Sequence, residues 1–160
     1  MKLWVDADSC PVPVRDMICR AGKRLRLPVL YVANREIPRS NDDPVTMILA
    51  DSNPDAADDY IVENAITGDL VITRDIPLAK RLVNKDILVI NDRGTVYTQS
   101  NINERLSMRD FMLEIYNNGF TPEKTGQFGK RELNAFANAL DREITRLLKQ
   151  FPQRQGNAPE

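Results

Sequence analysis

Short, continuously apolar segments alternate with helical segments over the first ninety residues of the chain. Runs of strand length lie at residues 2–5, 29–33, 45–49, 70–73 and 87–90. Strands that alternate with helices pair in parallel, because each crossover returns the chain to the same end of the sheet. Strands that are apolar at every position are buried on both faces. The sequence therefore predicts an α/β fold, a three-layer sandwich with a mainly parallel central sheet of about five strands and helices on both faces.

The rest of the sequence predicts helices and little further strand. The expected helices span residues 12–24, 77–83, 103–116 and 130–148, and a further helix starts within SNPDAADDYIVENA. The helices at 103–116 and 130–148 should each carry an apolar stripe. Residues 95–98 are expected to form a short additional strand.

No internal repeat and no long linker divides the chain. We therefore expect a single domain over residues 1–150 and a disordered tail over residues 151–160. The segment NNGFTPEKTGQFGK holds three glycines and a proline, and it is expected to be a mobile loop between the last two helices.

Histidine is absent from the 160 residues, which excludes several kinds of site. Neither a His-based triad nor an HExxH zinc site can form, so any chemistry depends on carboxylates, hydroxyls, lysine, arginine or cysteine. The GxGxxG and P-loop patterns are also missing, which disfavours dinucleotide and P-loop nucleotide sites. The net charge is −1, yet residues 15–39 hold seven Lys/Arg against two Asp/Glu, and residues 40–73 hold eight Asp/Glu and no Lys/Arg. This asymmetry fits an anionic substrate that meets a metal site, and equally a solvated charge mosaic.

The sequence carries no sign of export or membrane insertion. An apolar strand stands where a signal peptide would be, and no apolar run approaches the ~20 residues of a membrane span. If Cys10 and Cys19 both lie on the first helix, they are about 13 Å apart along its axis, too far for a disulfide. We expect a cytoplasmic protein with no membrane contact. The oligomeric state is left open.

The first apolar run leads directly into two carboxylates, in LWVDADSCPV. Residues two apart on a strand share a face, so Asp6 and Asp8 are expected to converge. Two such charges a few ångströms apart repel by roughly 1–4 kcal/mol. A proton, a cation or the positive end of the helix that begins near Pro11 and Pro13 has to compensate.

Other predicted strands also end on polar groups at the same edge of the sheet, where ligands of open parallel sheets bind. Beyond the first strand, the residues at this edge are Asn34, Arg35, Thr73, Arg74, Asp75, Asn91 and Asp92, and Asp55, Asp58 and Asp59 start the helix that precedes the fourth strand. Each acid has an ordinary explanation when taken alone, because Asp55 and Asp75 suit helix caps and Asp58 and Asp59 suit a first helical turn. Together, carboxylates from three elements predict a divalent-cation site, since Mg²⁺ prefers oxygen ligands.

Several motifs in order resemble the YaiI/YqxD family of uncharacterised bacterial proteins. They are VDADSCPV, VANREI, PDAADDYI, GDLVITRDIPLA, NDRG, MRDFM and FANALDR, and together they cover about residues 2–150. The family is considered PIN-like. The resemblance therefore implies a parallel sheet whose acidic residues bind Mg²⁺ or Mn²⁺ and cleave RNA.

The resemblance also implies roles for particular residues. The PIN acid after the first strand falls on Asp6 with Asp8 as an extra, the helical acid falls on Asp58 or Asp59, and the acid after the following strand falls on Asp75. The fourth PIN position falls near Asn91 or Asp92, and an asparagine there is a weaker ligand.

The preferred hypothesis is a Mg²⁺- or Mn²⁺-dependent ribonuclease. Its expected catalytic residues are Asp6, Asp8, Asp58, Asp59 and Asp75, and its expected metal ligands are Asp6, Asp8, Asp58 and Asp75. Phosphate or substrate contacts are expected from Ser9, Asn34, Arg35, Thr73, Arg74, Asn91 and Arg93.

Two alternatives remain. A PIN-like protein can keep the acidic pocket and bind RNA or a partner without cutting, although no aromatic residues cluster near the acids in the sequence to stack bases. A phosphatase of the haloacid-dehalogenase type would use Asp6 as nucleophile and Asp8 as general acid. It would also need a lysine between the acidic motifs, and Lys23, inside the first helix, is the only lysine between them.

Overall fold

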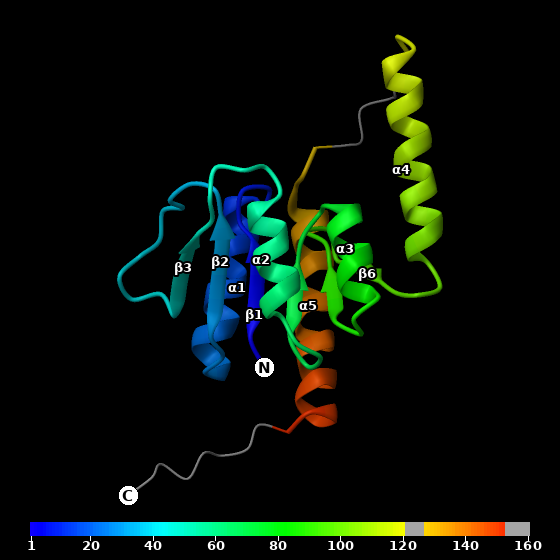
Figure 1. Cartoon of the computed structure of the whole chain (residues 1–160). Helices are drawn as coiled ribbons and strands as arrows, with labels where there is room; N and C mark the ends of the chain where they lie inside the picture. Colours follow the sequence, from blue (N-terminus) through cyan, green and yellow to red (C-terminus); the bar gives the residue numbers. More distant parts are fainter. Residues whose placement is uncertain (121–126, 153–160) are drawn as a thin grey trace, which may run out of the picture.

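The computed structural model describes residues 1–120 and 127–152, which contain one six-stranded sheet (Figure 1). The strand order is β3-β2-β1-β4-β5-β6, and only β6 is antiparallel to its neighbour. The strands are β1 Leu3–Asp6, β2 Val29–Ala33, β3 Val45–Leu49, β4 Leu70–Ile72, β5 Leu88–Ile90 and β6 Val96–Tyr97. The predicted α/β sandwich is confirmed, with β6 as a sixth strand at one edge.

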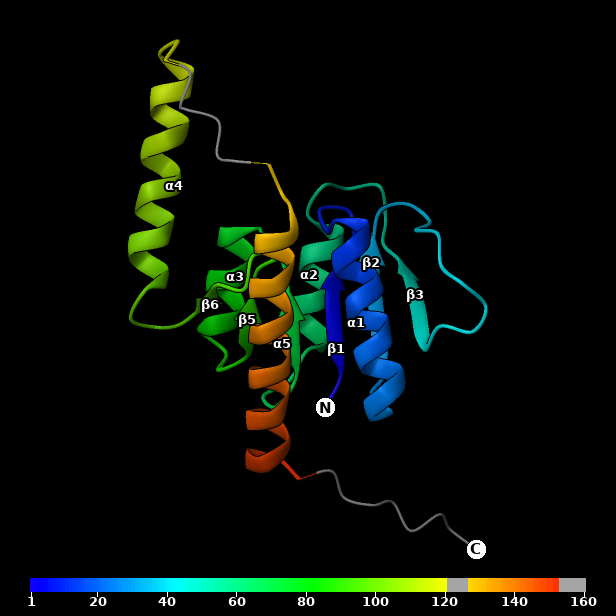
Figure 2. The ribbon, with the colours of Figure 1, turned by 180° about the vertical axis from the view of Figure 1, so that it is seen from behind.

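Within the described residues, helices cover both faces of the sheet. They are α1 Val12–Leu25, α2 Ala56–Asn64, α3 Ile76–Val83, α4 Ile102–Asn117 and α5 Lys130–Gln150. Figure 2 shows α1 and α5 side by side on one face, and Figure 1 shows α2 and α3 on the other. None of the described helices is long and apolar enough to cross a membrane.

Alternation along β1 assigns its side chains to the two layers. Leu3 and Val5 pack with Ile18 of α1 and Phe136 of α5 in one buried cluster. Trp4 faces the opposite way and packs in a second cluster with the apolar sides of α2 and α3. Asp6 is two residues beyond Trp4, so it lies at the strand end on the α2–α3 face.

Asp69 is a structural acid. It is 3% exposed and accepts hydrogen bonds from the Lys2 and Ile66 amides and from the Trp4 indole, at 2.9, 3.1 and 3.0 Å. A buried carboxylate with three donors is fully compensated. It ties the start of β1 to the turn before β4.

α4 differs from the expectation of a helix packed along one apolar stripe. Its first turn packs on α3 through the buried Ile102, but large apolar side chains further along remain exposed. Figures 1 and 2 show α4 running past the carboxyl end of the sheet, away from the core. The predicted mobile loop and disordered tail fall mostly on residues 121–126 and 153–160, outside the described residues.

Candidate functional site

Asp6 is a buried carboxylate at the carboxyl end of the central strand. Its side chain accepts hydrogen bonds from the Thr73 hydroxyl at 2.7 Å and from the Ser9 hydroxyl at 3.3 Å. Burial raises the pKa of Asp6, and the charges of Asp75 and Asp8 act in the same direction against the two hydroxyl bonds. The position therefore favours a proton or a cation beside this carboxylate.

Asp8 lies in the turn after β1 rather than on the strand, because β1 ends at Asp6. Strand alternation was therefore the wrong reason for placing the two acids together. Asp8 accepts hydrogen bonds from the Asn34 amide at 3.1 Å and the Arg35 side chain at 3.2 Å. These bonds tie the turn after β1 to the end of β2 and keep Asp8 at the same edge as Asp6.

Asp75 follows β4 and caps α3, as its sequence position suggested. Its Oδ1 accepts the Leu78 amide at 3.0 Å, and its own amide donates to the Thr73 hydroxyl at 3.0 Å. Thr73 is 2% exposed, and its hydroxyl therefore contacts two acids at once. It donates to the Asp6 carboxylate and accepts the backbone amide of Asp75. The Thr73 hydroxyl positions the Asp6 carboxylate and the Asp75 backbone, and it is buried rather than exposed to a substrate.

The phase of α2 separates Asp58 from Asp59. Asp58 lines a cavity together with Asp6 and Asp75, whereas Asp59 pairs with Arg81 of α3 at 2.9 Å. Burial raises the pKa of Asp58 to about 6, with Asp75 and Asp6 as further causes. Asp55 stands at the helix start without a side-chain capping bond.

The acids share one open cavity of about 460 Å³. It lies beyond the carboxyl ends of β1, β2 and β4, the edge at which the sequence placed the site. The lining residues are Asp6, Asp8, Ser9, Asn34, Pro54, Ala57, Asp58, Arg74, Asp75, Ile76 and Arg109. Arg109 comes from α4 and belongs to the motif MRDFM, which indicated the family but not the cavity.

The other predicted contacts lie outside the cavity lining. Asn91 organises the β5–β6 turn, because its Oδ1 accepts the amides of Arg93 and Thr95 at 3.0 and 2.9 Å. The Arg93 guanidinium lies 5.8 Å from the centre of the Phe128 ring. Asp92 is buried and paired with Arg74, which links the ends of β5 and β4.

The acidic side chains line one cavity without forming, in the described part of the chain, a ready-made cation cluster. Within the described residues, no group of three or more Cys, Asp or Glu side chains is placed to hold one metal ion directly. Cys10 adds no reactive thiol, because burial raises its pKa to about 12 and keeps it protonated.

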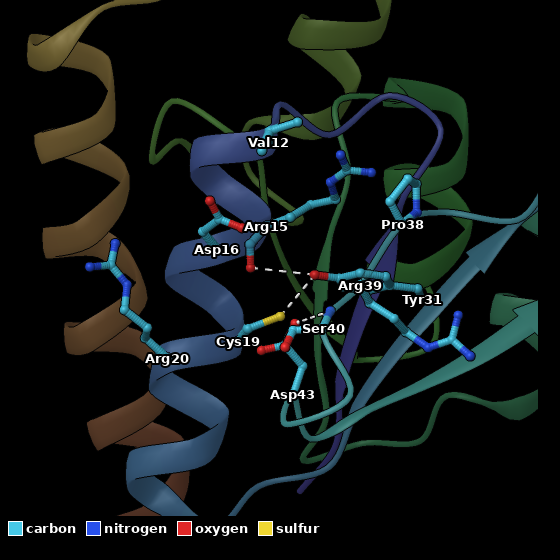
Figure 3. Close-up of a pocket in the computed structure, with 10 residues that line it drawn as sticks. All are labelled: Val12, Arg15, Asp16, Cys19, Arg20, Tyr31, Pro38, Arg39, Ser40 and Asp43. Carbon is cyan, nitrogen blue, oxygen red and sulfur yellow. Dashed lines mark hydrogen bonds between the residues drawn. The ribbon is translucent and has the colours of Figure 1, made fainter.

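A second cavity, of about 740 Å³, lies between α1 and the β2–β3 connection (Figure 3). Its floor is the pair formed by the Tyr31 hydroxyl and the Cys19 sulfur, 2.9 Å apart. Burial raises the pKa of both groups, so the floor stays neutral. Three arginines and two aspartates also line this cavity, and none of the predicted site residues does.

The fold and the site define an α/β protein with an acidic cavity at the carboxyl edge of a mainly parallel sheet. The chain belongs to the YaiI/YqxD family, because the family model described as "Uncharacterized BCR, YaiI/YqxD family" matches residues 4–146. This confirms the family to which the motifs pointed.

Curated relatives match over almost their whole length. The UPF0178 protein of Treponema denticola is 55% identical over 94% of this chain and 96% of its own. That of Treponema pallidum is 48% identical over 100% of this chain and 90% of its own, and that of Myxococcus xanthus is 44% identical over 96% and 100%. No solved structure matches the chain.

Proposed function

We propose that this protein is a Mg²⁺- or Mn²⁺-dependent hydrolase that cleaves RNA phosphodiester bonds. The observation that carries the proposal is the gathering of Asp6, Asp8, Asp58 and Asp75, from three chain segments, around one cavity. An all-oxygen donor set suits these cations. A cation would also offset the burial and the repulsion between carboxylates that together raise the pKa of Asp6 and Asp58.

The four aspartates would hold the cation, in part through water, since they do not converge on one point. A bound Mg²⁺ or Mn²⁺ would activate water and stabilise charge on the phosphoryl group. Asp6 is already oriented by Thr73 and Ser9, and Asp75 keeps Oδ2 available because only Oδ1 caps α3. Arg74 and Arg109, the two cations of the lining, would meet phosphate oxygens.

The haloacid-dehalogenase alternative fits this cavity less well. Its chemistry needs a lysine near the two acids, and no lysine is among the described residues that line the cavity. Lys80, on α3, instead pairs with Asn103. A non-catalytic binding protein would use the same cavity, so cleavage has to be measured separately from binding.

Calorimetric titration of Mg²⁺ and Mn²⁺ tests the metal site, and cleavage of single-stranded RNA tests the reaction. Asp6→Asn and Asp75→Asn are expected to abolish metal binding and to lower cleavage by at least about 10²-fold. Each substitution removes the negative charge of one proposed metal ligand. Asparagine keeps the size of the side chain and can still cap α3.

Asp59→Asn is the matched control, since Asp59 lies next to Asp58 but pairs with Arg81 outside the cavity. It is expected to bind metal and cleave RNA like the wild type. Equal cleavage by the wild type and both site variants would refute the hydrolase. Metal binding without cleavage would favour the non-catalytic alternative.

A further inference from the structure

One face of α4 continues from the body of the protein to the acidic cavity and beyond it. α4 packs on α3, with Ile102 buried and Leu106, one turn later on the same side of the helix, half-buried. Arg109, which lines the cavity, follows Leu106 by three residues and so lies on the same side of the helix. Leu113 and Tyr116, four and seven residues after Arg109, extend this face further.

The outer part of this face is apolar, aromatic and uncovered. Leu113 is 45% exposed and Tyr116 is 64% exposed. A soluble protein rarely leaves large apolar side chains in a row without a binding role. No aromatic residue clusters near the acids in the sequence. The fold, however, places α4, the helix that carries Tyr116, beside their cavity.

The charges on α4 favour an anionic occupant on this same face. Arg105 stands one turn before Arg109, whereas Glu104 and Glu114 are each five residues from Arg109, about 140° around the helix. Arg109 pairs with its neighbour Asp110 at 3.1 Å, yet its side chain is 40% exposed and a guanidinium has further donors. Positive charge beside an exposed aromatic ring is the combination that holds single-stranded nucleic acid.

We propose that this face of α4 is a platform for unpaired RNA, on which Tyr116 stacks a base while Arg109 contacts a phosphate next to the acidic cavity. The proposal deepens the proposed function and rests on it for the placement of RNA at this edge. It makes single-stranded RNA the substrate class, because bases paired in a duplex have no free face to stack on Tyr116. Continuity with the cavity, through Arg109, favours RNA over a protein partner.

Fluorescence anisotropy of a labelled single-stranded oligoribonucleotide, in the presence of a chelator, measures binding without cleavage. Tyr116→Ala is expected to weaken binding about fivefold to hundredfold, the usual effect of losing one stacked base. Tyr116→Phe is expected to retain the wild-type affinity. Arg109→Gln is expected to reduce the slope of log K against log salt concentration by about 0.7, one phosphate contact on a single strand.

Phe111→Ala is the matched control, because Phe111 is a 56% exposed aromatic residue of the same helix. It lies two residues from Arg109, about 200° around α4. Its affinity should equal that of the wild type, and Tyr116→Ala should leave any binding to the matching duplex unchanged.

The platform and the hydrolase can fail separately. The platform would be overturned if Tyr116→Ala and Phe111→Ala lowered the affinity for the single strand equally. It would also be overturned if the wild type did not bind the single strand, even if cleavage is observed. The expected binding pattern without metal-dependent cleavage would support the platform and refute the hydrolase. Binding of a protein partner to this face with no RNA binding would also overturn the platform.

Discussion

Asp58 carries a charge that the folded protein disfavours. Its pKa is raised to about 6 by burial and by two nearby carboxylates, whereas an aspartate in the unfolded chain titrates near about 4. The folded state therefore binds the proton more tightly, and stability falls as the pH rises between these two values. In a chelator, Asp58→Asn is expected to raise the melting temperature at pH 7 and to change it much less near pH 4.

Asp59→Asn again provides the control at the neighbouring position. Asp59 forms a half-exposed ion pair with Arg81, and such pairs contribute about 0–1 kcal/mol. Its melting temperature should change little at either pH. If Asp58→Asn instead lowers the melting temperature at pH 7 in the chelator, its charge is stabilised by an attraction that outweighs burial and the nearby carboxylates.

At the same residue scale, sequence reasoning identified the segments of the site better than the individual side chains. Asp6 and Asp75 could be found because a strand end followed by an acid is a local pattern. The choice between Asp58 and Asp59 depends on the exact rotation of α2 near its first turn, which the sequence does not fix. In the structure Asp59 pairs with Arg81, and Asp58 lines the cavity. Arg109 could not be found, because only the three-dimensional path of α4 brings it to the cavity.

At the scale of elements, the turn between β5 and β6 depends on Gly94. Its φ is +86°, and an added Cβ would lie 2.5 Å from the Ala135 carbonyl oxygen of α5. Gly94→Ala is expected to lower the free energy of unfolding by about 2–4 kcal/mol, from backbone strain and overpacking together. Urea denaturation measures the loss.

Gly119→Ala separates the two causes. Gly119 has the same φ of +86°, but nothing lies within 4 Å of its added Cβ. Gly119→Ala should therefore lower the free energy of unfolding by the backbone strain alone, about 1 kcal/mol. An equal loss of unfolding free energy in both variants would show that α5 moves aside without cost and that packing at Gly94 is loose.

Element boundaries were predicted well where the signal is local. The observed β2 and β3 match the predicted residues 29–33 and 45–49, because continuous apolar runs end at turn residues. The environment of α4 was predicted poorly. Its apolar residues occur around the whole helix, so periodicity does not show which face is buried.

At the scale of the whole molecule, stability is concentrated in the sheet and its two helical layers. Phe136, Leu140 and Ile144 of α5 are buried against the sheet. Beyond the turn that carries Ile102, the side chains of α4 are exposed or at most half-buried. A helix held by packing at only one end opens locally at a small free-energy cost.

Native-state hydrogen exchange tests this uneven distribution. Amides of residues 108–117 are expected to exchange at least about tenfold faster than those of the buried turns of α5, because their opening does not require the core to unfold. The wild type and the Asp59→Asn variant should show the same pattern. Equal protection of α4 and α5 would mean that the outer half of α4 is covered, and protection that rises with protein concentration would identify the cover as a second copy of the chain. Fast exchange that slows when single-stranded RNA is added would instead join this local instability to the RNA platform, since the ligand would stabilise the helix that it contacts.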